Sequence, residues 1–226
     1  MRPATRLQAS AALGQQQLAW KGIAPWVLED AGVEEVDGVV WIPSRDETGR
    51  TLYCKAFHYA RSWYEPSGID LIPFGVERLP VSAWIAERSA LLVTEGESDA
   101  FAAREAFVEG DSKILAWYVV ALPGSGTWRR SWAEYVKAFT VVYLLGDGDD
   151  AGRRMNEAVW KDLPWARPVW LPEGRDVRAI LQAGGREALL PFLREADYDA
   201  LLAAALRASD GDVHRFERLV REGLES

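Results

Sequence analysis

Three acidic residues directly follow apolar stretches of the chain that have the composition of buried strands. Glu95 comes after the run LLVT, and Asp147 and Asp149 come after the run VVYLL. Such runs are typical of strands in an α/β sheet, and these sheets bind ligands beyond the carboxyl ends of their strands. We therefore expect the three carboxylates to lie on one rim, where hard oxygen ligands suit Mg²⁺.

The spacing of the second acidic pair also favours a shared cation. Residues two apart in extended backbone point the same way, and the glycine between them, Gly148, should let a ligand approach the main chain. The alternative is that each acidic cluster only caps a helix. The candidates for such caps are Ser98 and Asp99 in the first cluster and Asp149 and Asp150 in the second. We favour the metal site because both clusters follow strand-like runs.

The two acidic segments resemble the signature of the Toprim domain, the catalytic module of bacterial-type DNA primases, topoisomerases and some small nucleases. In that family a Glu-Gly after one strand and an Asp-x-Asp-x-x-Gly after another bind divalent metal. The matching residues here are Glu95-Gly96 and Asp147 to Gly152. The resemblance implies a Rossmann-like α/β fold, a largely parallel sheet flanked by helices. It also implies two Mg²⁺ or Mn²⁺ ions held by the catalytic residues Glu95, Asp147 and Asp149.

Three more elements of the family occur in the same order along residues 90–185. Asp99 completes a Glu-Gly-x-x-Asp element that begins at Glu95. The segment LPEGRDV at 171–177 resembles a primase segment in which an aspartate, here Asp176, follows Gly-Lys or Gly-Arg. ALPGSGT at 121–127 follows the strand-like run AWYVV and resembles the Gly/Ser/Thr turn that these enzymes place beside the acidic site. The residues implied are Asp99 and Asp176 for a second ion or its waters, and Gly124 and Ser125 for the nucleotide.

The stretch before residue 82 is similar to the N-terminal subdomain of primase cores. Helices are expected over 8–20 and from Pro25 to Gly32. Strand-like runs follow, with a hairpin turn at 46–49 and another turn near 60–61. By the resemblance, this subdomain holds template and nucleotide over the metals.

Several basic and aromatic residues are candidates for contacts with nucleic acid. Lys55 and Arg61 are expected to face the cleft, although both could equally be solvated strand residues. Arginine pairs follow the Gly-Ser-Gly turn and Gly152, and because adjacent helical residues point to different faces, at most one of each pair should reach the site. The first pair is Arg129 and Arg130, and the second is Arg153 and Arg154. In the first pair we favour Arg129. Exposed aromatic rings can stack on unpaired bases, and the nearest candidates are Trp63, Tyr64 and Trp128.

The composition is that of a globular, soluble protein, and we expect a cytoplasmic location by default. Apolar residues make up 49% and charged residues 27% of the 226, and no apolar stretch reaches the ~18 residues of a membrane span. The N-terminus lacks the apolar core of a signal peptide. With one cysteine and two histidines, neither an internal disulfide nor a Cys/His zinc site is expected, so we expect no counterpart of the zinc-binding domain of cellular primases.

The net charge of −8 is unusual for a protein that binds nucleic acid. Residues 1–64 are neutral, with seven Lys/Arg and seven Asp/Glu, so the whole excess lies in 65–226. Metal ions would offset part of this charge. We expect weak or partner-assisted binding to DNA.

We predict three parts: an N-terminal α+β subdomain over 1–82, a Toprim domain over 83–185, and a C-terminal helical extension over 186–226 with breaks near Asp197 and at Asp210-Gly211. The resemblance implies metal-dependent synthesis of RNA primers from nucleoside triphosphates on single-stranded DNA, beside a helicase or a separate template-recognition protein. The alternatives are a Toprim metal-dependent nuclease and a non-catalytic accessory protein that binds single-stranded DNA or the replisome. No Walker motif occurs, so the chain itself is not a helicase.

Overall fold

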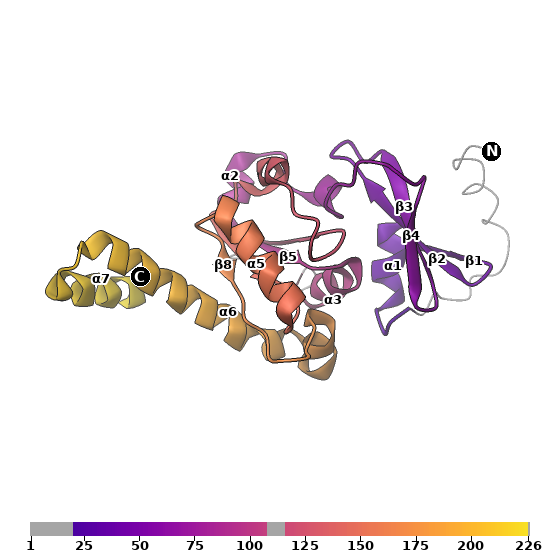
Figure 1. Cartoon of the computed structure of the whole chain (residues 1–226). Coiled ribbons are helices and arrows are strands. Elements are labelled where there is room, and N and C mark those ends of the chain that lie inside the picture. Colours follow the sequence, from indigo (N-terminus) through magenta and orange to yellow (C-terminus); the bar gives the residue numbers. More distant parts are fainter. Residues whose placement is uncertain (1–19, 108–115, 226) are drawn as a thin grey trace.

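The computed structural model describes residues 20–107 and 116–225, and it contains two four-stranded sheets (Figure 1). The helix expected over 8–20 lies outside the described residues apart from Trp20. None of the described helices combines the length and the apolar character needed to cross a lipid bilayer.

The chain enters the described part through a short helix that matches the expectation from its sequence. Helix α1 spans Pro25–Ala31, with proline in its first turn, where a missing N–H costs nothing. It ends at Gly32, whose φ of 72° is the left-handed conformation that glycine adopts without steric penalty. Val27 and Leu28 on this helix are fully buried.

The first sheet is antiparallel, in the order β1-β2-β3-β4. Its strands span Glu34–Val36, Val39–Arg45, Thr51–His58 and Arg61–Glu65. The two turns expected at 46–49 and near 60–61 are confirmed as the β2–β3 and β3–β4 connections. In the first turn the Asp46 carboxylate accepts hydrogen bonds from the Thr48 and Arg50 N–H groups, which is the way aspartate stabilises tight turns.

The second sheet is parallel, in the order β6-β5-β7-β8, which confirms the predicted α/β class. Its strands are β5 (Ser89–Thr94), β6 (Ala116–Ala121), β7 (Val141–Leu145) and β8 (Arg167–Pro168). Every residue of β5 is buried, as expected for a central parallel strand covered on both faces. The apolar runs before Glu95 and Asp147 are therefore the adjacent strands β5 and β7.

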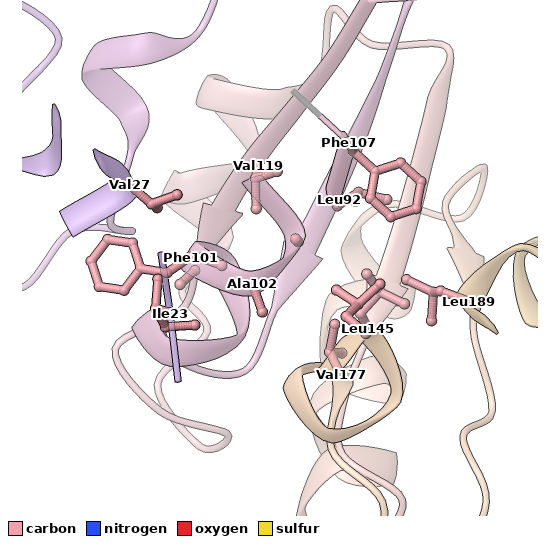
Figure 2. Close-up of a cluster of buried hydrophobic side chains, with 14 of the residues drawn as sticks. Ile23, Val27, Leu92, Phe101, Ala102, Phe107, Val119, Leu145, Val177 and Leu189 are labelled. Atoms are coloured by element: carbon pink, nitrogen blue, oxygen red, sulfur yellow. The ribbon is translucent and has the colours of Figure 1, made fainter. Parts of the chain in front are cut away.

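Helices cover both faces of this sheet. On one face, Leu92 belongs to a buried cluster with residues of α3 (Glu97–Phe107), α1 and α6, which include Phe101, Val27 and Leu189 (Figure 2). On the other face, Leu91 and Val93 pack against α5 (Asp150–Asp162). The shorter elements are η2 (Val76–Arg78), α2 (Ala83–Ala86), η3 (Arg130–Trp132) and α4 (Ala133–Val136).

Because Ile42 of β2 belongs to the same core as Leu92 and Phe101, the antiparallel sheet packs on the α3 side of the parallel sheet. A backbone bridge between Phe74 and Ala121 also joins the two parts. The connection between β4 and α2 therefore touches the edge strand β6 at Phe74, before the chain continues through α2 into the central strand β5.

The C-terminal helices only partly follow the prediction. Helix α6 spans Val177–Ser209 with a kink at Gly184 and Gly185, and its Leu189 and Leu193 still belong to the main core. The end of α6 and α7 (Val213–Glu225) project from the body (Figure 1).

The predicted break at Asp210-Gly211 is confirmed, since both residues have positive φ. The break predicted near Asp197 is wrong. The helix continues through that residue, because its carboxylate accepts hydrogen bonds from the Tyr143 hydroxyl and from Arg167 on the neighbouring sheet.

Candidate active site

The acidic residues that follow β5 and β7 meet at the carboxyl edge of the parallel sheet. Glu95 is the first residue after β5, and Asp147 lies two residues after β7, which pairs directly with β5. The Asp147 N–H donates to Glu95 Oε2 at 3.3 Å. Two segments separated by 52 residues in the chain are thus in contact.

The loop after β7 is packed so tightly that three of its positions require glycine. A Cβ on Gly146 or Gly152 would overlap the backbone of the opposite arm of the loop, at Gly152 and Asp147 respectively. A Cβ on Gly148 would overlap the carbonyl of Pro172. The expectation that Gly148 leaves room for a ligand is therefore wrong, because the chain's own backbone fills that space.

The backbone that approaches Gly148 belongs to the segment 171–177. The Gly148 N–H donates to the Arg175 carbonyl at 2.7 Å, and the Gly174 N–H donates back to the Gly148 carbonyl at 2.9 Å. These two bonds fasten the segment beside the β7 loop. They bring Asp176 close enough to contribute to the electrostatic field at Asp147.

Two of the acids also cap helices. Asp149 Oδ1 accepts from the Gly152 N–H at 2.8 Å at the start of α5, and Asp176 caps α6 through the Ala179 N–H. Of the caps considered from the sequence, the one by Asp149 is therefore correct, and the cap by Asp176 was not predicted. The cap of Asp149 uses one carboxylate oxygen, so it does not compete with a second role for the other oxygen, whereas Asp176 Oδ2 accepts a hydrogen bond from Arg178.

Asp99 does not open a helix, because α3 already begins at Glu97. Its side chain is buried, and Oδ1 accepts from the Arg178 N–H at 3.0 Å. This hydrogen bond joins the first turn of α3 to the first turn of α6. We call Glu95, Asp99, Asp147, Asp149 and Asp176 the acidic rim.

The acidic rim carries more negative charge than its surroundings balance. Burial, followed by the charges of Asp99 and Glu95, raises the pKa of Asp147 to about 7. Burial and the charge of Asp176 raise the pKa of Asp99 to about 6. The pKa of Glu95 is also raised, by burial and then by Asp149.

A cation would relieve this crowding. Asp147 Oδ1 is buried and has no hydrogen-bond partner in the part of the chain that the structure describes, which is costly for an ionised carboxylate. Within the described residues, however, no group of three or more His, Cys, Asp or Glu side chains is already arranged to hold a metal ion. The chemistry of the donors nevertheless fits a hard cation such as Mg²⁺, which is bound through carboxylate oxygens and completes its shell with water and phosphate oxygens.

The predicted basic residues are placed very differently from one another. Lys55 is buried; its Nζ lies 2.7 Å from Glu97 Oε2 and donates to the Pro123 carbonyl at 3.3 Å. Arg61 is exposed at the β3–β4 turn, opposite His58, and makes no hydrogen bond or ion pair with the acidic rim. Arg129 is exposed and pairs with Asp70 at 3.1 Å.

The Gly-Ser-Gly turn after β6 does reach the rim. Ser125 interacts with Glu95 and lowers its pKa, in opposition to burial. Gly124 forms the turn itself: its carbonyl accepts from the Thr127 N–H and hydroxyl at 3.2 and 2.7 Å.

Three residues near the rim were not predicted. Lys21 Nζ lies 3.4 Å from Ser98 Oγ, and the Asp99 charge acts on it. Arg178 bonds Asp176 as well as Asp99. Asn156 is buried and links Gly146 to Val169. The contacts of Lys21 with Ser98 and of Arg178 with Asp99 join segments 77 and 79 residues apart. The one local signal was the basic residue before a turn glycine in WKGIAP.

Comparisons with known proteins agree with this architecture. No protein-family model matches the sequence. "Gene 57 protein" of Mycobacterium phage D29 is 33% identical over 100 residues, which cover 44% of this chain and 60% of the phage protein.

Two solved structures extend the likeness to the fold. The primase fragment of the bacteriophage T7 primase-helicase protein matches with a TM-score of 0.62 and 24% identity, over 76% of this chain and 71% of the T7 fragment. The DnaG primase catalytic domain bound to ssDNA matches with a TM-score of 0.55 and 22% identity, over 83% of this chain and 68% of that domain. The chain thus has the fold of a DNA primase catalytic core.

Proposed function

We propose that this chain is a Toprim-type primase core that joins ribonucleotides on a single-stranded DNA template with Mg²⁺ or Mn²⁺. The observation that carries the proposal is the acidic rim, in which five carboxylates from three separate segments crowd around Oδ1 of Asp147, a buried atom with no hydrogen-bond partner among the described residues. A primase-like fold alone would not require this arrangement. Structural stability does not explain it either, because the crowding raises the free energy of the folded state.

Glu95, Asp147 and Asp149 would hold the metal, and Asp99 and Asp176 would bind a second ion or orient its waters. The reaction is attack of a primer 3′-oxygen on the α-phosphorus of a nucleoside triphosphate, with release of pyrophosphate. A divalent metal held by these residues would offset the phosphate charge and would lower the pKa of the attacking hydroxyl. The chain itself keeps the carboxylates within reach through the glycine-dependent β7 loop and the Gly148–Arg175 backbone bonds.

The contact between the two sheets gives the N-terminal part a place in this function. Lys55 on β3 bonds Glu97, two residues from Glu95, and Tyr64 on β4 donates to the Pro123 carbonyl at 2.8 Å, just before the Gly-Ser-Gly turn. Template and nucleotide would bind where the first sheet meets the rim. Lys55 would act there as a positioning residue, because its amino group is already paired.

Template and helicase partners are part of the same proposal. The name of one structural neighbour is that of a primase-helicase protein, and the other neighbour is bound to ssDNA. With a net charge of −8, the chain should bind DNA weakly by itself. Primer synthesis should therefore increase when a helicase partner is added.

A direct test compares Asp147→Asn with Asp150→Asn. Asp150 lies on the same loop but is exposed and paired with Arg153 at 3.2 Å, so it controls for the loss of one carboxylate. With single-stranded template, four ribonucleotides and Mg²⁺ or Mn²⁺, we expect labelled oligoribonucleotides from the wild type and from Asp150→Asn. Asp147→Asn should lose at least about 100-fold in rate. Undiminished synthesis by Asp147→Asn would refute the assignment.

One observation favours a non-catalytic alternative, an accessory protein that binds single-stranded DNA. In the described part of the chain, the acids do not yet form a complete metal site. The same assay separates the possibilities, because an accessory protein would retain the template without making product, and a nuclease would degrade it.

A further inference from the structure

An open cavity lies beside the acidic rim and is not part of it. It has a volume of about 290 Å³ and is lined by Ser125, Gly126, Trp128, Arg154 and Ala158. These residues come from the turn after β6 and from helix α5. The volume is near the lower limit for small-molecule sites, which suits a single nucleotide unit. We call it the Trp128 cavity.

The Trp128 cavity is next to the acidic rim because one residue, Ser125, connects the two. Ser125 lines the cavity and also interacts with the Glu95 carboxylate. On the α5 side, Arg154 is the fifth residue after the helix N-cap, Asp149. A ligand that contacts Ser125 in the cavity would therefore lie alongside Glu95.

The aromatic wall of the cavity is held in place before any ligand arrives. Trp128 Nε1 donates to Asp162 Oδ2 at 2.9 Å, and its ring meets Trp132 edge to face, with centroids 6.1 Å apart. Trp128 is only half-buried and lines the cavity. An indole that is already fixed loses little side-chain entropy when a base stacks on it.

The second wall supplies an unused positive charge. Arg154 is exposed and makes no hydrogen bond or ion pair with any described residue, whereas its neighbour Arg153 pairs with Asp150 at 3.2 Å. A guanidinium forms paired hydrogen bonds with phosphate oxygens. Ala158, one turn further along α5, is small and leaves the space between the arginine and the indole open.

We propose that the Trp128 cavity binds one nucleotide unit, with the base against Trp128 and a phosphate against Arg154. The inference rests on the proposed function, because it adds a nucleotide subsite to the same acidic rim. It assigns the phosphate contact to Arg154 rather than to Arg129, whose guanidinium is paired with Asp70. The same chemistry is offered by one nucleotide of a single strand and by a free nucleoside triphosphate.

The test measures binding without synthesis, so that its result does not depend on the metal site. Affinities for a fluorescein-labelled oligothymidylate and for labelled ATP are measured by anisotropy in EDTA, across a series of salt concentrations. The variants are Arg154→Gln and its matched control Arg153→Gln. The two changes remove the same charge from adjacent positions of one helix.

We expect Arg154→Gln to weaken binding about 3- to 10-fold at low salt and to reduce the slope of log affinity against log salt by about 0.7, the value for one phosphate contact on a single strand. Arg153→Gln should leave the slope unchanged. Trp128→Leu should weaken binding by a further factor of about 10 through lost stacking. Trp128→Phe keeps an aromatic ring and should retain most of the affinity. Circular dichroism and thermal unfolding check that each variant is folded.

A loss confined to the oligonucleotide assigns the cavity to the template or primer strand, and a loss confined to ATP assigns it to the incoming nucleotide. Equal binding of both ligands by Arg154→Gln, Arg153→Gln and the wild type would overturn the inference. If the wild type makes no primers but Arg154→Gln still weakens binding, the proposed function fails and the nucleotide site stands. If primers are made and Arg154→Gln binds normally, only the nucleotide site fails.

Discussion

Two neighbouring groups of charged side chains in this molecule differ in whether their buried charges are paired. The first is the Lys55 clamp, in which Lys55 pairs with Glu97 at 2.7 Å while Lys55 and Tyr64 both donate to the Pro123 carbonyl. The second is the acidic rim, where carboxylates face one another and Asp147 Oδ1 has no partner. The clamp satisfies its buried charges, and the rim does not.

The contrast between paired and unpaired charges is sharpest within the segment EGESD at 95–99. Glu97 is turned toward the clamp, whereas Glu95 and Asp99, two residues away on either side, belong to the rim. Buried charges that are paired hold elements together, while charges left in mutual repulsion indicate a site that waits for a ligand. The three acids of one short segment therefore have different roles.

The largest expected effect comes from breaking the clamp. Lys55→Met leaves the Glu97 carboxylate buried and unpaired, so the free energy of unfolding should fall by about 3–5 kcal/mol, as measured by urea denaturation. The double variant with Glu97→Met should recover more than half of this loss, because both charges are gone. A double variant no more stable than Lys55→Met would show that the clamp is not an isolated pair.

The second largest loss of stability should come from pushing the segment 171–177 away from the loop after β7. In Gly148→Ala the new Cβ would overlap the Pro172 carbonyl, and overpacking of this kind costs roughly 1–3 kcal/mol. Gly126→Ala is the matched control, since a Cβ there meets nothing within 4 Å. Thermal unfolding should show a lower midpoint for Gly148→Ala alone, and equal midpoints for the two variants would contradict the packing.

The smallest effect is a gain in stability on relieving the rim. The pKa of Asp147 is raised in the folded state, from 3.8 to about 7, so the folded state binds the proton more tightly. Its contribution to stability is complete below pH 3.8 and is lost as the pH rises through about 7. Metal-free Asp147→Asn should therefore be more stable than the wild type by roughly 1–2 kcal/mol at pH 8 and equally stable at pH 3.5.

The measurement is chemical denaturation at the two pH values, first in EDTA and then with Mg²⁺. Added Mg²⁺ should stabilise the wild type at pH 8, because a ligand that binds only the folded state raises its stability. It should have little effect on Asp147→Asn, which lacks the carboxylate proposed to bind the ion. A wild type that is the more stable of the two at pH 8 in EDTA would contradict strong repulsion in the rim.

Local sequence patterns were sufficient for much of the fold. The buried strands before Glu95 and Asp147, helix α1 between Pro25 and Gly32, and both turns of the antiparallel sheet were predicted correctly. Each depends on residues close together in the chain: apolar runs, a proline at a helix start, or glycine and aspartate in a turn. The acids at strand ends were found for the same reason.

The partners of the charged side chains could not be found in this way. The sequence by itself determined which segments become strands and which carboxylates follow them, because those choices depend on neighbouring residues. Only the tertiary structure decided that Lys55 is buried against Glu97, that Gly148 receives the backbone of 172–175, and that α6 continues through Asp197. Each of these outcomes depends on contacts between segments 24 to 54 residues apart, and such contacts leave no local pattern in the chain.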